Sequence, residues 1–473
     1  MKKYIISFIL IVSIGSTAVA QDIKGYKLTF KLNDVEDSTL YLSYFYGAGQ
    51  YYRDTAQAIE KGVYIFENKE DTLEYGMYSL ITKDSKIIDF LVDAQNITIE
   101  GSKEDIIHNV KFKNSPENTV FFNYLKYLRV KQNESKELNQ KLAITENEKE
   151  KEFLTKKIAG LDDEVEAYLE NFHKENEGTL ASNFILSMEQ PRIPKKPEDS
   201  ELADSVFALY YYKNHYLENI NFKDGRLVRT PTYHEKLEYY IEKLTYQQTD
   251  SLIESCDEIL GLAQQNQDLF KYTLSWLTSR YERSNKMDDD AVFVHLVLNY
   301  FDKGLADEWY DKTNLKKLID KAKTLEPLLI GKVAPNLVLK DTAQKKVYQL
   351  HDVKAKFTIL YIWSPTCGHC KVATPELLDI YHKYKKDGVK VYAVNERFEN
   401  KEWIDFINEH NLDFINVSDG GDFVSNFRDL YDVYSTPHTY LLDKDKKILA
   451  KKVPIETLDK ILEHFIEKEK NEK

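Results

Sequence analysis

The spacing of apolar residues changes twice along this chain of 473 residues, and the three patterns limit the folds that it can adopt. Over residues 22–112, apolar and polar residues alternate, as at Tyr26, Leu28 and Phe30. A period of two is typical of β-strands with one buried face. Asp, Asn, Gly and Lys separate the short runs, so residues 21–113 are predicted to form a small β-rich domain, an antiparallel sandwich or barrel.

From Pro116 onward the spacing becomes helical, with apolar residues three and four positions apart. One apolar seam predicts a long helix that packs against a neighbour. The residues of the seam are Leu154, Ile158, Leu161, Val165, Tyr168 and Phe172. Further helices are expected at roughly 198–216, 233–244, 247–263, 268–283, 289–303 and 313–327. Residues 114–330 are therefore predicted to form an all-α domain.

A third pattern, in which strands and helices alternate, follows a short boundary at residues 331–335. Residues 357–363 are almost continuously apolar, which is typical of a strand buried on both faces. The other strands are expected at 336–339, 347–350, 389–394, 438–442 and 447–451, and the helices at 368–385, 401–410, 423–431 and 456–469. The predicted fold class is therefore multidomain, with a C-terminal α/β domain at residues 331–473.

The first 20 residues predict a secretory signal peptide. Lys2 and Lys3 precede an apolar run, and an A-x-A pattern ends at Ala20. The run is shorter than the roughly 20 residues that span a bilayer. Because no later segment is long and apolar enough to span one, the mature protein is expected to have no integral membrane segment and to reside in the periplasm.

Composition and charge exclude several functions. The formal net charge is -13 and no long Lys/Arg block is present, so the chain would repel nucleic acid. Three cysteines are too few for a disulfide-stapled scaffold, and Cys256 in a predicted helix is expected to be a buried, unreactive thiol. The 11 histidines show no metal-binding spacing, and no second ligand pair accompanies the two remaining cysteines and His369. We therefore expect neither a metal nor another cofactor.

The strongest chemical motif is Cys367-Gly368-His369-Cys370, placed where the buried strand ends and a helix begins. Two cysteines three positions apart in a helical turn can approach closely enough to form a disulfide. The free N–H groups and the positive dipole end of the helix favour a thiolate at Cys367, and a protonated His369 would add to this effect. A thiolate is the species that attacks disulfides. Cys367 is therefore predicted to attack and Cys370 to resolve the mixed disulfide.

This motif resembles the thioredoxin superfamily, and its context resembles the periplasmic TlpA/ResA-like thiol–disulfide oxidoreductases. The matching positions are Trp363, the C-G-H-C motif, Pro375, Gly388 and Thr436-Pro437. The resemblance implies a thioredoxin-like fold for residues 331–473 and a cis-proline, Pro437, which shapes a groove and keeps metals and stray thiols from the cysteines. It also implies a substrate-binding region in which the Thr436 backbone pairs with an extended substrate segment and Trp363 packs beneath the active site.

The same resemblance implies protein substrates with disulfides or thiols, and an electron partner that is a membrane protein with thiols of its own. Relatives of this type mostly act as reductants, for example in cytochrome c maturation. The first two regions, including Leu227-Val228-Arg229-Thr230-Pro231, are similar to uncharacterised domains that precede thioredoxin-like domains in secreted bacterial oxidoreductases.

The sequence departs from the family at the proton acceptor of the second cysteine. Thioredoxins have a buried Asp where this chain has Tyr361, and related periplasmic reductases have a Glu where it has Ala373. His369, Glu376 and Glu396 are the candidate substitutes.

Several functions remain open, and reduction of disulfides in envelope proteins is favoured. The C-G-H-C motif also resembles that of disulfide isomerases, so an oxidase or isomerase is one alternative. A binding or scaffold protein in which the cysteines are incidental is another. A thiol peroxidase is disfavoured, because Pro365-Thr366 directly precedes Cys367 and does not match the spacing of that class.

Overall fold

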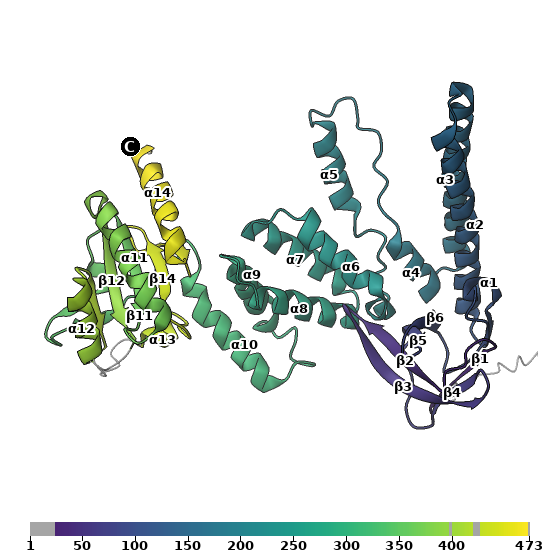
Figure 1. Cartoon of the computed structure of the whole chain (residues 1–473), viewed down its shortest axis with the longest axis horizontal. Coiled ribbons are helices and arrows are strands. Elements are labelled where there is room, and N and C mark those ends of the chain that lie inside the picture. Colours follow the sequence, from purple (N-terminus) through teal and green to yellow (C-terminus); the bar gives the residue numbers. More distant parts are fainter. Residues whose placement is uncertain (1–23, 397–399, 420–425, 472–473) are drawn as a thin grey trace, which may run out of the picture. The chain divides into compact units, whose positions relative to one another are not determined.

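The computed structural model describes residues 24–396, 400–419 and 426–471. The predicted signal peptide, residues 1–20, lies outside the described residues. The chain forms two compact units, unit 1 at residues 1–240 and unit 2 at residues 241–473 (Figure 1). Within the described residues, no helix is both long and apolar enough to cross a membrane. The domain boundaries given above remain predictions.

Unit 1 begins with an eight-stranded sheet, in the order β6-β5-β2-β3-β4-β1-β7-β8. The strands are β1 (Tyr26–Leu32), β2 (Thr39–Tyr46), β3 (Gly49–Glu60), β4 (Val63–Asn68), β5 (Gly76–Ile81), β6 (Lys86–Val92), β7 (Asn96–Gly101) and β8 (Lys111–Lys113). The ring centroids of Phe30 on β1 and Phe90 on β6 are 5.5 Å apart, although four strands lie between β1 and β6 in the order of the sheet. The sheet therefore folds over its own core, in the manner of a sandwich.

Two features of this sheet differ from the prediction. The sheet is not wholly antiparallel, because β1 pairs in parallel with β7. Alternation reports which residues face the core, but it carries no information on strand direction. Strand β3 was not predicted, because only Ala56 among its residues is buried and the apolar alternation is absent.

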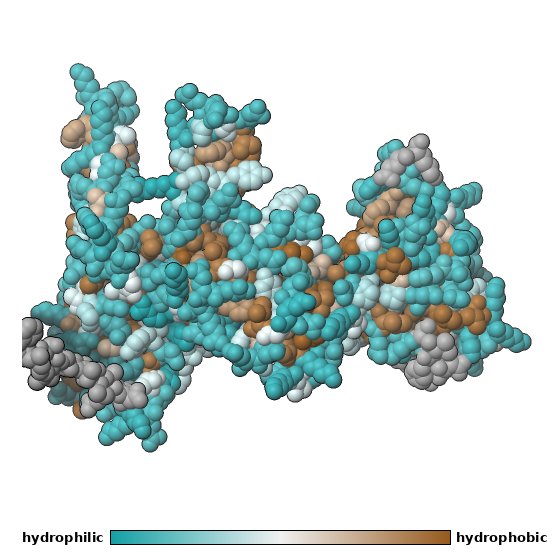
Figure 2. Space-filling model, turned by 180° about the vertical axis from the view of Figure 1, so that it is seen from behind, coloured by the Kyte–Doolittle hydropathy of each residue, from teal (hydrophilic) through white to brown (hydrophobic). Residues whose placement is uncertain are grey.

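The helices of unit 1 include a long hairpin, α2 (Pro116–Ile144) and α3 (Glu148–Glu175), which lie side by side in Figure 1. Leu138 of α2 packs with Leu154 and Leu161 of α3, so the predicted seam is confirmed. The side of the hairpin seen in Figure 2 is mainly hydrophilic. A short helix, α1 (Ile106–Asn109), precedes the hairpin. Three helices follow it, α4 (Leu180–Met188), α5 (Asp204–His215) and α6 (Pro231–Tyr239).

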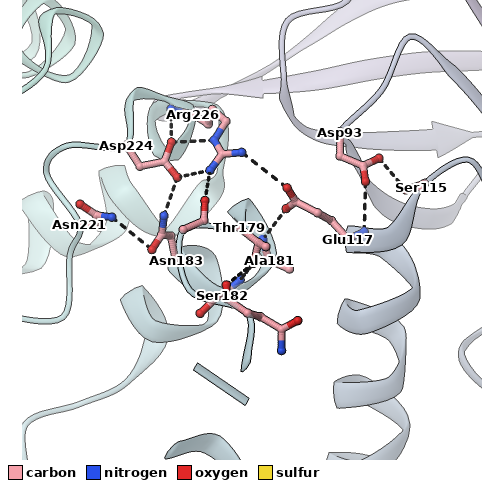
Figure 3. Close-up of polar contacts among 12 residues, drawn as sticks. Asp93, Ser115, Glu117, Thr179, Ala181, Ser182, Asn183, Asn221, Asp224 and Arg226 are labelled. Atoms are coloured by element: carbon pink, nitrogen blue, oxygen red, sulfur yellow. Dashed lines mark hydrogen bonds and ion pairs between the residues drawn. The ribbon is translucent and has the colours of Figure 1, made fainter. Parts of the chain in front are cut away.

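A polar network joins the sheet of unit 1 to its helices (Figure 3). Asp93, just after β6, accepts hydrogen bonds from the Ser115 hydroxyl at 2.6 Å and the Glu117 N–H at 3.1 Å, and so caps α2. Glu117 then accepts from the N–H of Ala181 in α4 at 3.0 Å and lies 3.6 Å from Arg226 Nη1. Because these partners satisfy groups that would otherwise be buried without hydrogen bonds, the network supports the packing of α2 and α4 beside the sheet.

Unit 2 contains four helices followed by a seven-stranded sheet. The helices are α7 (Thr249–Ala263), α8 (Gln267–Glu282), α9 (Asp289–Leu296) and α10 (Lys312–Leu325). The strands are β9 (Val338–Asp341), β10 (Val347–Gln349), β11 (Phe357–Trp363), β12 (Val389–Asn395), β13 (Ile415–Ser418), β14 (His438–Leu442) and β15 (Ile448–Lys451), in the order β10-β9-β13-β12-β11-β14-β15. Strands β13, β12 and β11 are parallel, and β14 is antiparallel to β11.

The central strand β11 is the one predicted from its apolar run, and all of its residues are buried. Helices α11 (Gly368–Tyr384), α12 (Asn400–His410) and α14 (Ile455–Asn471) contribute Leu377, Trp403 and Leu458 to the same core. The predicted helix at 423–431 is much shorter in the described part of the chain, where α13 spans Phe427–Leu430. Residues 423–425 lie outside the described residues.

Candidate active site

The two cysteines of the C-G-H-C motif lie at the start of α11, directly after β11. Cys367 is the N-cap residue of this helix and is half-buried, whereas Cys370 lies in the first turn and has an exposed fraction of 0%. Both are free thiols. A buried strand thus leads straight into a helix N-terminus, where backbone N–H groups point at the first sulfur.

The environment of Cys367 favours its thiolate. Partial burial raises the pKa of the Cys367 thiol. Hydrogen bonds lower it by a larger amount, and they come from the N–H groups of Cys370 and His369 and from the side chains of Thr436 and Cys370. The net result is a pKa below the ordinary value. The thiol Sγ also lies 3.3 Å from the carbonyl oxygen of Thr436. Cys367 therefore has the character of a nucleophile at the protein surface.

The second sulfur behaves in the opposite way. Burial raises the pKa of the Cys370 thiol to about 12, and its interactions with Cys367 also raise it. The backbone of Ser364 and the side chain of Thr436 form hydrogen bonds that lower the pKa in part. The two thiols therefore differ in acidity: the half-buried Cys367 loses its proton more readily than an ordinary cysteine, and the buried Cys370 less readily.

The Thr436–Pro437 peptide bond is cis, as the resemblance implied, and its Thr436 carbonyl faces Cys367. Glu396, directly after β12, is contacted by this loop and by α13. The Thr436 hydroxyl donates to Glu396 Oε2 at 3.5 Å, and Arg428 Nη2 donates to the Glu396 carbonyl oxygen at 2.5 Å. The contact between Cys367 and Thr436 joins the helix N-terminus to a loop 69 residues later in the chain.

Trp363 lies beneath the motif, in the core that also contains Cys370. Its ring stacks on Tyr361 with centroids 6.2 Å apart and meets Phe406 edge to face at 5.2 Å. The exposed fraction of Trp363 is 0%, so its side chain supports the site from below and presents no surface to a bound substrate.

The three candidate proton acceptors occupy different places. His369 and Glu376 are exposed on the surface of α11, and the Glu396 carboxylate is held by Thr436 and by Arg428 Nη2 at 3.4 Å. At the buried position where thioredoxins have Asp, the Tyr361 hydroxyl forms a 2.9 Å hydrogen bond with the Thr374 hydroxyl. The role of Thr374 was not predicted, because a single Thr in an amphipathic helix gives no signal in the sequence.

A groove of about 970 Å³ runs beside the motif. Val372, with 66% exposed, and Tyr434, with 90% exposed, supply apolar surface to it. Its charged and titratable side chains are His369, Glu376, Asp432, His438, Lys452 and Glu456. An extended polypeptide with an apolar residue could occupy a groove of this kind.

His438, directly after Pro437, was not predicted. It is 8% exposed, its ring stacks on Tyr440 at 5.3 Å, and its Nε2 has no hydrogen-bond partner among the described residues. Burial lowers the pKa of His438 to about 4, and the positive charge of Lys452 adds to this effect. The imidazole is therefore neutral at physiological pH.

Within residues 24–396, 400–419 and 426–471, no group of three or more His, Cys, Asp or Glu side chains is arranged to hold a metal ion. A central sheet, a C-x-x-C pair at a helix N-terminus and a facing cis-proline define the C-terminal part as a thioredoxin-like domain. Residues 330–451 match the AhpC/TSA family, whereas residues 145–325 and 26–121 match two domains of unknown function, DUF5106 and DUF4369.

Comparison with known proteins identifies the family more closely. Thiol-disulfide oxidoreductase ResA of Bacillus thuringiensis is 31% identical over 144 residues, which are 30% of this chain and 80% of that protein. The chain therefore belongs, through this region, to the ResA family of thiol–disulfide oxidoreductases, and it is an enzyme of that class.

Two solved structures are also similar. A domain of a possible thiol-disulfide isomerase from Cytophaga hutchinsonii is 41% identical and covers 31% of this chain and 99% of its own, with a TM-score of 0.29. The thioredoxin domain of a thiol-disulfide oxidoreductase from Bacteroides vulgatus is 28% identical and covers 29% of this chain and 97% of its own, with a TM-score of 0.28.

Proposed function

We propose that the protein is a periplasmic dithiol reductase that passes electrons from its C-G-H-C motif to disulfides of envelope proteins. The observation that carries the proposal is the contrast between the two thiols. Cys367 is half-buried with a lowered pKa, and Cys370 is buried with a pKa raised to about 12. Such a pair separates an attacking thiolate from a resolving thiol that waits until a mixed disulfide has formed.

The reaction follows from this contrast. The Cys367 thiolate attacks one sulfur of the substrate disulfide, the substrate S–S bond breaks, and one substrate thiolate leaves and takes a proton from water. Cys370 then loses its proton and attacks Cys367 Sγ, which releases the second substrate sulfur as a thiol. Two electrons have passed to the substrate, and Cys367 and Cys370 are joined by a disulfide. A membrane protein with thiols of its own would return the motif to the reduced state.

The groove beside the motif supports a polypeptide as the substrate. An extended segment would lie against Pro437, with its backbone beside Thr436 and an apolar side chain near Val372 and Tyr434. The N-terminal sequence supports export, since Lys2, Lys3 and the A-x-A pattern at Ala20 resemble a cleavable signal. Purification from cells followed by N-terminal sequencing should find a mature chain beginning at Gln21.

Trapping provides the main test of the function. A Cys370→Ala variant, expressed in its natural compartment, should retain substrates as mixed disulfides on Cys367. These complexes should disappear on reduction and should be absent from a Cys367→Ser/Cys370→Ala variant. A Cys256→Ala variant is the matched control, because it removes a thiol outside the motif and should behave as the wild type. Failure to trap any protein would count against a protein substrate.

The direction of electron flow requires a separate measurement. Reduction is proposed because TlpA/ResA-like proteins mostly act as reductants, whereas a protonated His369 would favour the oxidising direction. Equilibration of the motif against glutathione gives its potential. A value above about −180 mV would instead favour an oxidase or isomerase. Rapid consumption of hydrogen peroxide with unimpaired turnover in a Cys370→Ala variant would favour a peroxidase.

A further inference from the structure

The buried hydroxyl of Tyr361 lies beneath the resolving cysteine. Tyr361 is on β11 and has an exposed fraction of 0%, and its Oη is 2.9 Å from Thr374 Oγ1. Thr374 is one helical turn after Cys370, and both side chains are buried. Residues four apart lie on the same face of a helix. Tyr361 and Cys370 also lie in the same buried core cluster, and interaction with Cys370 is one of the causes that raise the pKa of Tyr361.

This arrangement differs in kind from a carboxylate at the same position. Burial raises the pKa of Tyr361 above the usual value of 10.0, and the neighbouring cysteines raise it further. The phenol therefore keeps its proton throughout the pH range in which thiol exchange occurs. It cannot remove the proton of Cys370, but it can donate a hydrogen bond to the thiolate that remains.

We propose that Tyr361 is a catalytic hydrogen-bond donor whose O–H points to Thr374 Oγ1 in the resting dithiol and turns to Cys370 Sγ when that sulfur becomes a thiolate. The proposal rests on the proposed function and specifies its second half-reaction. In that step the mixed disulfide between Cys367 and the substrate breaks and the Cys367–Cys370 disulfide forms. Cys370 loses one proton to solvent, and the departing substrate sulfur takes up one proton from solvent. Tyr361 retains its proton throughout.

The size of the effect follows from the hydrogen bond. A hydrogen bond to a charged group contributes about 1.5–3 kcal/mol, so its loss should slow the step roughly 10- to 100-fold. The first half-reaction should be unaffected, because the Cys367 thiolate is stabilised by backbone N–H groups and by the side chains of Thr436 and Cys370, all of which remain in Tyr361→Phe.

Rapid mixing of the reduced protein with one equivalent of an oxidised model substrate, 5,5′-dithiobis(2-nitrobenzoate), separates the two half-reactions. Each releases one coloured thiolate, first as Cys367 attacks the reagent and again as Cys370 resolves the mixed disulfide. The reagent is not used in excess, because a second molecule could react directly with Cys370. Tyr361→Phe should leave the first release within about twofold of the wild type and slow the second by roughly 10- to 100-fold.

Two further variants separate this role from a loss of packing. Tyr392→Phe removes another buried hydroxyl of the same sheet, which bonds to the Tyr348 carbonyl at 2.9 Å, and it should slow neither release. Thr374→Val removes the competing partner of Tyr361 and should leave the second release as fast as, or faster than, in the wild type. A purely structural hydroxyl pair would instead make Thr374→Val as slow as Tyr361→Phe, and that result would overturn the proposal.

The pH profile of the wild type tests the same idea without a substitution. The rate of the second release should rise with pH as a single thiol ionises. An additional ionisation in this profile between about pH 4 and 6, where carboxylates titrate, would overturn the proposal. Normal kinetics of Tyr361→Phe would also overturn it while leaving the proposed function intact. If the wild type itself released no thiolate in a Cys367-dependent manner, the proposed function would fail instead.

Discussion

Lys451 Nζ lies 2.6 Å from Asp290 Oδ2 and 2.9 Å from the carbonyl oxygen of Leu328, all within unit 2. Lys451 is on β15 and only 4% exposed, and Asp290 is in the first turn of α9. Lys451 is paired with Tyr440 on β14, the strand that begins directly after Pro437. The helical part of unit 2 is thus attached to the strand pair that carries one wall of the groove.

Asp290→Ala should destabilise unit 2 by about 3–5 kcal/mol, because it leaves the Lys451 ammonium buried without its carboxylate. Chemical denaturation followed by circular dichroism would measure the loss. The double variant Asp290→Ala/Lys451→Met is the control, and it should recover much of the lost stability because it removes the unpaired charge. A single variant as stable as the wild type would show that the pair contributes little.

The three cysteines should differ strongly in their rates of alkylation. Cys367 has a lowered pKa, whereas burial raises the pKa values of Cys370 and Cys256 to about 12 each. Iodoacetamide at neutral pH, with mass spectrometry of the peptides, should modify Cys367 first, and its rate should level off below the pH of about 8.5 expected for a free cysteine. Equal rates at the three sites would contradict this account of the motif.

Acid should destabilise the fold partly through His438, whose pKa is lowered by burial to about 4 from 6.5. The unfolded state binds this proton more readily, so the contribution is complete above about pH 6.5 and is lost as the pH falls towards about 4. The change from 6.5 to about 4 corresponds to roughly 3 kcal/mol. Denaturation at pH 7 and at pH 4 would measure how much unfolding free energy each protein loses on acidification. His438→Gln should lose less than the wild type by about this amount, and an equal loss in both proteins would contradict the prediction.

Leu161→Ala should loosen the α2–α3 hairpin, because it removes a buried side chain from a small cluster with Leu138 and Leu154. A cost of about 2 kcal/mol or more is expected for such a truncation. Hydrogen exchange should accelerate in α2 and α3, while Cys367 alkylation in unit 2 should be unchanged. Replacing the exposed Phe153 with Ala is the matched control, since its side chain lies outside this cluster.

Local features could be predicted because neighbouring residues encode them. The apolar run at residues 357–363 identified β11 with its correct bounds, and the C-G-H-C motif placed Cys367 at the start of α11. The alternation over residues 22–112, which predicted a β-rich domain, likewise depends on residues close in sequence. Features without a local pattern were missed, including β3, whose residues are mostly exposed, and β13, which has only four residues.

The amino-acid order alone determined the three successive patterns of strands and helices, the position of the dithiol and the lack of a carboxylate at positions 361 and 373, because each of these is a property of nearby residues. Only the tertiary structure decided that β1 and β7 run in parallel, that Lys451 meets Asp290, and that Thr374 brings a hydroxyl to Tyr361 beneath Cys370. These contacts join residues distant in sequence, and they form only when the packing of buried side chains selects one arrangement among many that share the same local pattern.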